Sequence, residues 1–283
     1  MSDWQTRTGV RRWRTAGLLV WLLAVAAQAC GTPPPLVLAN PRGRPASGSV
    51  HLALGEPLDA DPSDDVPLDH GVFVLSYNPA RRVANWVAWR LVAEDLGAVP
   101  RSNRFHPDDL LAAAMPGPRS QDYVGSHYDR GHLCPSADRS ASSTANQETF
   151  VMTNMQPQRH ALNAGPWEAL ERFERDLASP DKQVFIVAGG LFDVAPEVLP
   201  GGEAIPRANF KIIVVLERGQ GAADVTPATA SYAVIMPNTR SVAGTAWSEY
   251  LVAIDDVERQ SGYDFLSRVP ARTQAALEAA RPR

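Results

Sequence analysis

Lysine is nearly absent from this sequence of 283 residues, in which Lys182 and Lys211 are the only lysines. The chain has 27 basic and 31 acidic residues and a formal net charge of −4 at pH 7. This balance excludes the strongly basic surface that many nucleic-acid-binding proteins have. A surface that binds phosphate groups must therefore be local and built from a few arginines.

Cysteine is also scarce, since Cys30 and Cys134 are the only two. The sequence has no Cys-x-x-Cys or His-Glu-x-x-His motif, which argues against a zinc site. The remaining composition is that of a globular protein, with 45% hydrophobic and 20% charged residues. A chain of this length can form one large domain or two small ones around a sizeable core.

The first thirty residues have the pattern of a secretory signal. Arginines at positions 11, 12 and 14 precede an apolar run over residues 16–27, which is too short to be a clear membrane span. The run ends in AVAAQAC, with an A-x-A cleavage pattern at Ala27–Ala29. We therefore expect residues 1–29 to be a signal peptide and the protein to be exported to the periplasm, the extracellular space or the cell envelope.

Cys30 follows the expected cleavage site, so a lipid anchor on Cys30 is an open alternative, as is an uncleaved membrane anchor. The pair Arg11–Arg12 also admits twin-arginine export, although its flanking residues fit that signal poorly. Loss of residues 1–29 removes four arginines and one aspartate, which leaves a net charge of −7. Export implies an oxidising compartment. We nevertheless expect no disulfide between Cys30 and Cys134, because one lies at the mature terminus and the other inside a polar motif.

Residues 30–67 are rich in proline, glycine and aspartate, which is typical of an exposed linker, and we expect the folded domain to span residues 68–283. Hydrophobic periodicity predicts strands at residues 71–78, 82–92, 149–156, 183–190, 209–217 and 231–237, and helices at residues 106–115, 162–178 and 246–262. The first two strands should form an antiparallel hairpin. Many strands, few helices and no regular βαβ alternation predict an α+β fold with a mainly antiparallel sheet.

The stretch YDRGHLCPSADR, residues 128–139, is the most polar candidate for a site. His132 has a side chain that titrates near neutral pH, so it could act as a general base or as a metal ligand. Gly131 allows a close backbone approach, Arg130 could bind a phosphate in a bidentate manner, and Asp129 could hold an imidazole or an arginine in place. A thiol enzyme based on Cys134 and His132 is an alternative, but no other feature supports it.

A second polar group lies downstream in TNMQPQRHALNAGPWEALE, around a predicted strand-to-helix transition. Its polar members are Asn154, Gln158, Asn163 and Glu171. Each residue alone has a simple structural explanation, such as a turn, a helix cap or a solvated helix face. Their combination with the first stretch is what indicates a function.

YDRGHLCPSADR, followed by TNMQPQ and LNAGPWEALE, resembles the DNA/RNA non-specific endonuclease family. These are the DRGH nucleases of the ββα-metal group, which include the mitochondrial endonuclease G type. SYNPARRVANWVAWRL resembles the leading hairpin of the family, and DDVERQSGYDFLSRVP resembles its closing helix and tail. The resemblance covers about residues 68–270 and implies a ββα-metal catalytic motif with flanking helices.

The resemblance implies that His132 is the general base that activates water and that Asn163 is the direct protein ligand of a Mg²⁺ ion, for which Mn²⁺ could substitute. Such sparse ligation suits magnesium, which keeps several waters and binds phosphate oxygens. Arg130 would contact the phosphate and stabilise the charge of the transition state.

Asn154 and Gln158 would bind or orient the substrate site, and Glu171 would act on water at the metal. On a regular helix, Asn163 and Glu171 would be about 12 Å apart, so Glu171 is not expected to be a neighbouring direct ligand. The family also has an arginine upstream of DRGH, for which RSNRF offers Arg101 or Arg104, and we select Arg104. Cys134 is expected to be a small packing residue.

These roles predict an exported, Mg²⁺-dependent endonuclease that hydrolyses DNA and RNA through contacts to the phosphate backbone, with arginines 130, 139 and 159 gathered at the site. One alternative is a phosphodiesterase of narrower nucleotide specificity on the same fold. Another is a catalytically silent nucleic-acid-binding lipoprotein at the cell surface. An inhibitor protein, a homodimer, and membrane attachment through the signal or Cys30 are left open.

Overall fold

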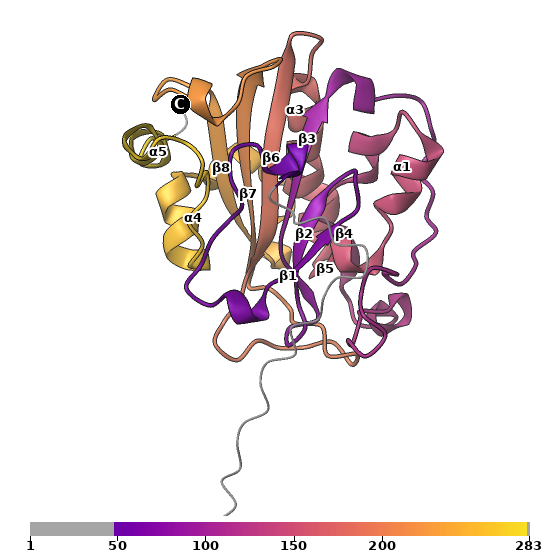
Figure 1. The fold of residues 1–283 in the computed structure, drawn as a ribbon. Helices are drawn as coiled ribbons and strands as arrows, with labels where there is room; N and C mark the ends of the chain where they lie inside the picture. Colours follow the sequence, from indigo (N-terminus) through magenta and orange to yellow (C-terminus); the bar gives the residue numbers. More distant parts are fainter. Residues whose placement is uncertain (1–47, 282–283) are drawn as a thin grey trace, which may run out of the picture. The chain divides into compact units, whose positions relative to one another are not determined.

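The computed structural model describes residues 48–281 (Figure 1). The predicted signal peptide, Cys30 and residues 30–47 of the predicted linker lie outside this range. The helices within residues 48–281 include none that is long and apolar enough to cross a bilayer.

A seven-stranded antiparallel sheet forms the centre of the described residues. In spatial order its strands are β1 (Val66–Asp69), β2 (Val74–Asn78), β3 (Val83–Val92), β6 (Lys182–Leu191), β7 (Ala208–Glu217), β8 (Ser231–Pro237) and β9 (Leu251–Val252). The second sheet of the described residues pairs β4 (Asp129–His132) with β5 (Met155–Gln158). The predicted α+β class with a mainly antiparallel sheet is therefore confirmed, as are the first hairpin and the three long strands after residue 180.

Helices lie against the sheet and around its edges. The α-helices of the described residues are α1 (Ser143–Glu148), α2 (His160–Leu162), α3 (Glu168–Leu177), α4 (Ile254–Ser261) and α5 (Ala271–Glu278). A π-helical turn, η8 (Asn163–Trp167), joins α2 to α3. The 3₁₀ helices are η2 (Val50–Leu52), η3 (Pro62–Asp64), η4 (Ala93–Asp95), η5 (Ser120–Tyr123), η6 (Ser136–Arg139), η7 (Met152–Asn154), η9 (Ala222–Asp224), η10 (Arg240–Val242) and η11 (Trp247–Tyr250).

The two faces of the sheet carry separate hydrophobic cores. Because successive strand side chains point to opposite faces, Trp86 and Trp89 of β3 enter different cores. Trp86 packs in a core that includes Val257 of α4 and Leu277 of α5, whereas Trp89 packs in a core that includes Leu170 of α3. The face covered by α3 is the one beside which β4 and β5 lie, so this core supports the site described below.

One of the two lysines of the chain is buried in the core under α3. Lys211 of β7 is fully buried, and its Nζ lies 2.8 Å from Oε2 of Glu174, which is also fully buried. The ammonium group lies 4.7 Å from the ring centroid of Trp167 and 5.3 Å from that of Trp89. Burial raises the pKa of Glu174, and the attraction of Lys211 opposes this shift. A pair of this kind costs desolvation free energy, but the loss of one partner costs more.

Several predicted elements are wrong. Residues 106–115 form turns instead of a helix, because the side chain of Asp108 accepts a hydrogen bond from the backbone N–H of Leu110 and competes with helical bonding. The strand predicted at 149–156 begins only at Met155, and the helix predicted at 246–262 is reduced to α4. Helices α1 and α5 were not predicted, since both are short and carry little apolar periodicity.

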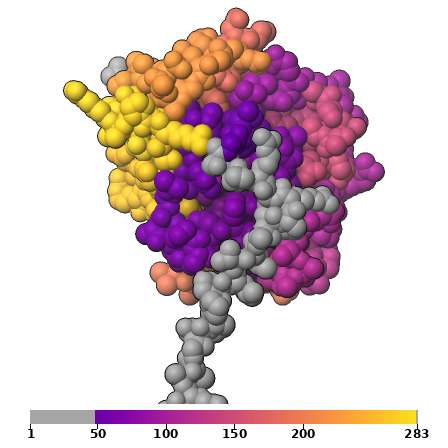
Figure 2. All heavy atoms as spheres, viewed as in Figure 1, coloured from indigo at the N-terminus to yellow at the C-terminus, as the bar shows by residue number. Residues whose placement is uncertain are grey.

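The predicted linker boundary is also wrong, because the part of residues 30–67 that the structure describes packs onto the domain. Leu52 and Leu54 lie in the core, and β1 spans the proposed boundary at residue 67. Arg268 N donates to Leu54 O at 3.1 Å, so this segment lies beside the C-terminal part, as the adjoining indigo and yellow atoms in Figure 2 show. Composition alone could not reveal that this segment is part of the domain, since the edge strand β1 forms only through hydrogen bonds that its neighbour β2 supplies.

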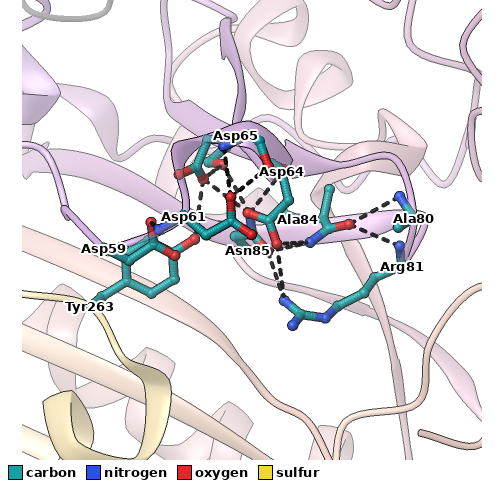
Figure 3. Close-up of polar contacts among 12 residues, drawn as sticks. Asp59, Asp61, Asp64, Asp65, Ala80, Arg81, Ala84, Asn85 and Tyr263 are labelled. Atoms are coloured by element: carbon teal, nitrogen blue, oxygen red, sulfur yellow. Dashed lines mark hydrogen bonds and ion pairs between the residues drawn. The ribbon is translucent and has the colours of Figure 1, made fainter. Parts of the chain in front are cut away.

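An acidic loop within that segment is held by the domain. The Asn85 amide donates to Asp64 and Asp65, the Tyr263 hydroxyl donates to Asp65 at 3.1 Å, and Arg81 lies 3.8 Å from Asp64 (Figure 3). These contacts join the loop to β3 and to the residues after α4. The aspartate-rich composition that suggests a linker is thus part of a fixed surface loop.

Candidate active site

The DRGH residues form β4, and residues 155–158 form its antiparallel partner β5. The register sets Gly131 opposite Gln156 and His132 opposite Met155. Helix α2 begins at His160, two residues after β5 ends, and the helical segment packs back on β4. Two antiparallel strands followed by a helix form a ββα motif.

The close packing at Gly131 explains why the motif has glycine there. A Cβ atom built on Gly131 would lie 2.6 Å from Cγ of Gln158 and nearer still to its amide group. Gln158 is fully buried, and neither atom of its amide has a hydrogen-bond partner within residues 48–281. Gln158 therefore packs against the strand that carries the histidine and does not reach a substrate surface.

Asn154 is a structural clamp for the turn that follows His132. Its Oδ1 accepts from Cys134 N at 2.9 Å, and its Nδ2 donates to Cys134 O and Thr149 O, both at 2.9 Å. Asn154 is fully buried and does not line either of the cavities described below. Asn154 and Gln158 can therefore orient the site, but the structure does not bring them to a position that would bind substrate directly.

His132 lies at the wall of a cavity of about 590 Å³ with only 4% of its surface exposed. Its ring packs edge-on against Phe150 at 4.9 Å between centroids and is tilted against Phe105 at 5.9 Å. Burial holds the pKa of His132 well below its usual range, and the charge of Arg101 lowers it further. Both effects favour the neutral imidazole, in which one ring nitrogen can accept a proton. Its Nε2 has no hydrogen-bond partner among the described residues.

Asn163 lies on the helical side of the same cavity, and Asp129 sets its orientation. Oδ2 of Asp129 accepts from Asn163 Nδ2 at 2.9 Å and lies 2.8 Å from Nδ1 of His160. Asp129 does hold an imidazole, as predicted, but it is the imidazole of His160 and not that of His132. Since Nδ2 of Asn163 is engaged, its Oδ1 is the atom left to bind a cation.

The helix between Asn163 and Glu171 is interrupted, contrary to the regular helix that was predicted. Gly165 has φ −118° and ψ −117°, outside the helical range, and the next residue is Pro166, which has no N–H to donate. The chain consequently makes a wide π-helical turn before α3 begins at Glu168. The distance of about 12 Å expected for a regular helix does not apply, and Asn163 and Glu171 line the same cavity.

Glu171 and Arg175 extend this cavity along α3. Burial raises the pKa of Glu171 to about 7, while the attraction of Lys211 opposes the shift. NH1 of Arg175 donates to Oδ1 of the buried Asp138 at 3.1 Å, and Trp89 Nε1 donates to the other oxygen at 2.9 Å. A carboxylate that can hold or release a proton near neutral pH therefore lies one helical turn from an anchored guanidinium.

The upstream arginine at the cavity is Arg101 and not Arg104, which corrects the choice made from sequence. Arg101 lines the cavity, donates to Ser136 Oγ at 3.2 Å and lies 4.9 Å from the ring centroid of Phe150. Arg104 instead donates to Oε1 of Gln147 on α1 at 3.2 Å and lines neither cavity of the site. The two arginines are three residues apart in an irregular segment, so sequence spacing could not distinguish them.

The predicted cluster of arginines 130, 139 and 159 is only partly formed. Arg130 donates to Ser120 Oγ at 2.7 Å and lies 4.5 Å from the ring centroid of Phe105, at a second cavity that adjoins the first. Arg139 is buried, and its guanidinium donates to the carbonyl oxygens of Val72 and Arg90, so it is a structural residue. Arg159 stacks over Tyr128 at 3.9 Å from the ring centroid.

Cys134 is buried next to the Asn154 clamp, whose Oδ1 accepts from its backbone N–H. Burial raises the pKa of its thiol well above the ordinary value. This agrees with the predicted packing role and argues against a thiolate nucleophile. The predicted absence of a disulfide between Cys134 and Cys30 stays a prediction, because Cys30 lies outside the described residues.

The oxygen atoms at the cavity fit a hard cation of the magnesium type. Asn163 offers an amide oxygen and Glu171 a carboxylate, which are ligands that Mg²⁺ prefers, and it commonly takes only one or two of them from a protein. Within residues 48–281, groups of three or more acidic, histidine or cysteine ligands occur only at Asp59, Asp64 and Asp65 and at Asp255, Glu258 and Glu278. The cavity therefore lacks the dense ligand set of an all-protein cage, in agreement with sparse ligation.

The fold and this site define a nuclease of the ββα type. The chain belongs to the DNA/RNA non-specific endonuclease family, whose model matches residues 57–272. It is 39% identical over 250 residues to a nuclease of Nostoc sp., which covers 87% of this chain and 89% of that protein. It is 33% identical over 215 residues to mitochondrial endonuclease G of Bos taurus, which covers 71% of this chain and 69% of that protein.

A solved structure gives the same result for the fold. The chain is similar to the endonuclease in the crystal structure of an EndoG/EndoGI complex, with a TM-score of 0.67 and 28% sequence identity. The match covers 82% of this chain and 96% of the other. The family resemblance seen in the DRGH motif is thereby confirmed, and the protein is a nuclease, a phosphodiester hydrolase.

Sequence reasoning missed two charged residues of the cavity, Arg175 and Glu168. Arg175 lies four residues after Glu171, which places the two on one face of a helix. That spacing was a usable signal. The buried anchor of Arg175, Asp138, was not predictable, because it lies 37 residues away in the chain.

Proposed function

We propose that this nuclease is Mg²⁺-dependent and hydrolyses phosphodiester bonds of both DNA and RNA with His132 as the general base. The observation that carries the proposal is the environment of His132. Its imidazole lies at the wall of a cavity that also contains Asn163 and Glu171, and burial and the charge of Arg101 favour its neutral form. A neutral, positioned imidazole beside a phosphate-binding cavity is suited to take a proton from water.

Asn163 would hold the Mg²⁺ ion through Oδ1, and Glu171 would contact it through water. When bound, the ion supplies positive charge that polarises the phosphate and lowers the cost of the departing oxyanion. Asp129 contributes by fixing the amide of Asn163 before the ion binds. Mn²⁺ prefers the same oxygen ligands and is expected to replace Mg²⁺.

The chemical step assigned to the protein is proton transfer at His132. A water oxygen attacks the phosphorus atom, its proton passes to the imidazole, and the bond between phosphorus and the 3′ oxygen breaks. Arg101, which lines the cavity of His132, and Arg130, at the adjoining cavity, would stabilise the negative charge that accumulates on the phosphate oxygens. General-base catalysis of this kind typically contributes about 10²–10⁴-fold to the rate.

We expect recognition of the phosphate backbone with little sequence preference. The net charge of −4, or −7 after loss of residues 1–29, provides no long-range attraction for a polyanion, so binding relies on the local arginines and the metal. Contacts to phosphate and sugar position the chain on a nucleic acid without reading bases. An inhibitor protein is a further proposed partner, since the similar solved structure is an EndoG/EndoGI complex.

We also propose that the protein is exported, on the pattern of residues 1–29, and that a lipid on Cys30 is one form of the mature N-terminus. Mass spectrometry of the mature protein from the native host tests this directly. Export predicts a chain that begins at or near Cys30, with an added lipid mass if Cys30 is an anchor. A mature chain that still begins at Met1 in the soluble cytosolic fraction would refute it.

Cleavage of plasmid DNA and of a long RNA tests the activity. The wild-type protein should cut both substrates with Mg²⁺ or Mn²⁺ and neither of them in EDTA. His132→Ala should cut at least a hundredfold more slowly. This variant should still unfold cooperatively, as a folded protein does. His127→Asn is the matched control, because His127 is exposed, lies outside the cavity of His132 and has a positive φ that asparagine tolerates, and it should cut at the wild-type rate. Equal cutting by wild type and His132→Ala, or cutting that persists in EDTA, would show the proposal to be wrong.

A further inference from the structure

A second cavity, of about 310 Å³, adjoins the one that contains His132. The two cavities share Arg101 and Asn163, so they lie on either side of these two residues. If the scissile phosphate lies at Asn163 and Arg101, as the proposed function requires, the chain that carries it must extend into both cavities. The second cavity is then the place for one of the two flanking nucleosides.

The walls of the two cavities differ in chemistry. The second cavity is lined by Phe105, Tyr123 and Tyr128, whereas the lining of the first contains no phenylalanine, tyrosine or tryptophan among the described residues. Phe105 packs under the guanidinium of Arg130, and Tyr128 packs under that of Arg159. Flat aromatic and guanidinium groups are the surfaces on which unpaired bases stack.

Tyr123 adds a hydrogen-bonding group that the protein leaves unused. Its side chain is almost entirely buried at the cavity, with 4% of its surface exposed. Its hydroxyl has no hydrogen-bond partner within residues 48–281. A buried hydroxyl without a partner is costly, and a polar ligand in the cavity would remove this cost.

The size and charge of the cavity further restrict the ligand. Its volume lies at the lower end of the range of about 300–1,000 Å³ that small-molecule sites have. Its charged wall residues are Arg101, Arg130 and Asp129, and the carboxylate of Asp129 is already engaged by Asn163 and His160. The remaining positive charge favours a ligand that combines a flat ring with a phosphate.

We propose that the second cavity is a nucleoside subsite, which stacks the base on one side of the scissile phosphate against Tyr128 and Phe105 and hydrogen-bonds it through the Tyr123 hydroxyl. The proposal rests on the proposed nuclease function. Because stacking tolerates every base, the subsite adds affinity without sequence preference. It makes the enzyme asymmetric, since a base is needed on one side of the cleaved bond and is dispensable on the other.

The test uses a short single-stranded DNA with one cleavable phosphodiester between uncleavable methylphosphonate linkages. Four versions carry a base on both sides of that bond, on the 5′ side alone, on the 3′ side alone, or on neither, with tetrahydrofuran residues as replacements. For the wild-type enzyme, kcat/KM should fall about tenfold when the base is removed from one side, as expected for the loss of one stacked base. Removal from the other side should have little effect.

Two variants link this asymmetry to the cavity. Tyr128→Leu should cleave the version without bases at the wild-type rate and should lose the preference between the two sides. Tyr123→Phe should raise KM severalfold for the favoured version and leave kcat unchanged, and it should not lower the unfolding midpoint, since it removes a costly unpaired hydroxyl. Tyr250→Leu is the matched control, because Tyr250 lines neither cavity, and it should keep the full asymmetry.

The outcomes separate the two proposals. If the wild type cleaves neither long DNA nor any of the four short versions, the nuclease function itself fails. If it cleaves all four versions at one rate, or if Tyr128→Leu retains the asymmetry, the nuclease function stands and the subsite is wrong. A preference for one side that disappears in Tyr128→Leu and survives in Tyr250→Leu supports the subsite.

Discussion

Replacement of Gly131 by alanine tests how the motif positions its histidine. The added Cβ would lie 2.6 Å from Cγ of Gln158, a separation that carbon atoms do not adopt without a shift of one of them. Gln158 is fully buried across the strand pair, so it has little room to move. Either the Gln158 side chain or strand β4 must shift, and a shift of β4 moves His132, the next residue along it.

The cost of the substitution follows from overpacking. The insertion of one methyl group into a filled interior typically costs about 1–3 kcal/mol. The same displacement acts on catalysis, because misplacement of a catalytic group by about 1 Å can reduce the rate about 10²-fold. Removal of the obstructing side chain in Gly131→Ala/Gln158→Ala should return most of the lost stability, since the alanine would then occupy space that the glutamine has left.

The measurement is a double-mutant cycle of urea unfolding, with plasmid cleavage on the same four proteins. We expect Gly131→Ala to be less stable by about 1–3 kcal/mol and at least tenfold slower. The coupling with Gln158→Ala should be favourable and exceed about 1 kcal/mol, as for residues in contact. The reasoning is refuted if Gly131→Ala unfolds at the wild-type urea concentration with the same slope, or if the two substitutions are additive.

Two further predictions concern the charged residues of the interior. Lys211→Met should lower the free energy of unfolding by about 3–5 kcal/mol, because it leaves Glu174 buried without its partner. The double variant Lys211→Met/Glu174→Leu should recover most of the lost stability. A single variant as stable as the double variant would contradict this prediction. Burial lowers the pKa of His70, but its contacts with Asp108 and Glu148 outweigh burial and raise the pKa from 6.5 to about 9. The resulting stabilisation is complete below pH 6.5 and is lost as the pH rises through 9. Urea midpoints measured from pH 6 to pH 9.5 should therefore fall more steeply for the wild type than for His70→Gln, and parallel curves would rule out the ion pair.

The long strands could be predicted from sequence because their information is local. Residues 183–190 and 209–217 are runs of β-branched and aromatic residues, and the structure has β6 and β7 at those positions. The turns at 106–115 and the edge strand β1 could not be predicted in this way. Their conformations depend on Asp108 being bound by His70 and Thr153, and on β2 supplying the hydrogen bonds of β1.

The same division holds for the site. The motif identified His132 and Asn163, and the structure brings both to one cavity with Glu171. The motif did not identify Arg101 over Arg104, the buried position of Arg139, or the role of Asn154 as a clamp. Each of these depends on contacts between residues far apart in the chain, and a side chain of the same type can serve either role.

The sequence by itself determined the α+β class, the family and the residue types of the site, because these depend on local periodicity and on a motif with fixed spacing. Only the tertiary structure decided which residues line the cavity. Asn163 and Glu171 line one cavity from either side of the kink at Gly165–Pro166, and Gln158 packs against Gly131 in the strand that carries His132. The physical reason is that burial and charge arise when distant segments pack, and these two properties set the proton affinity of His132.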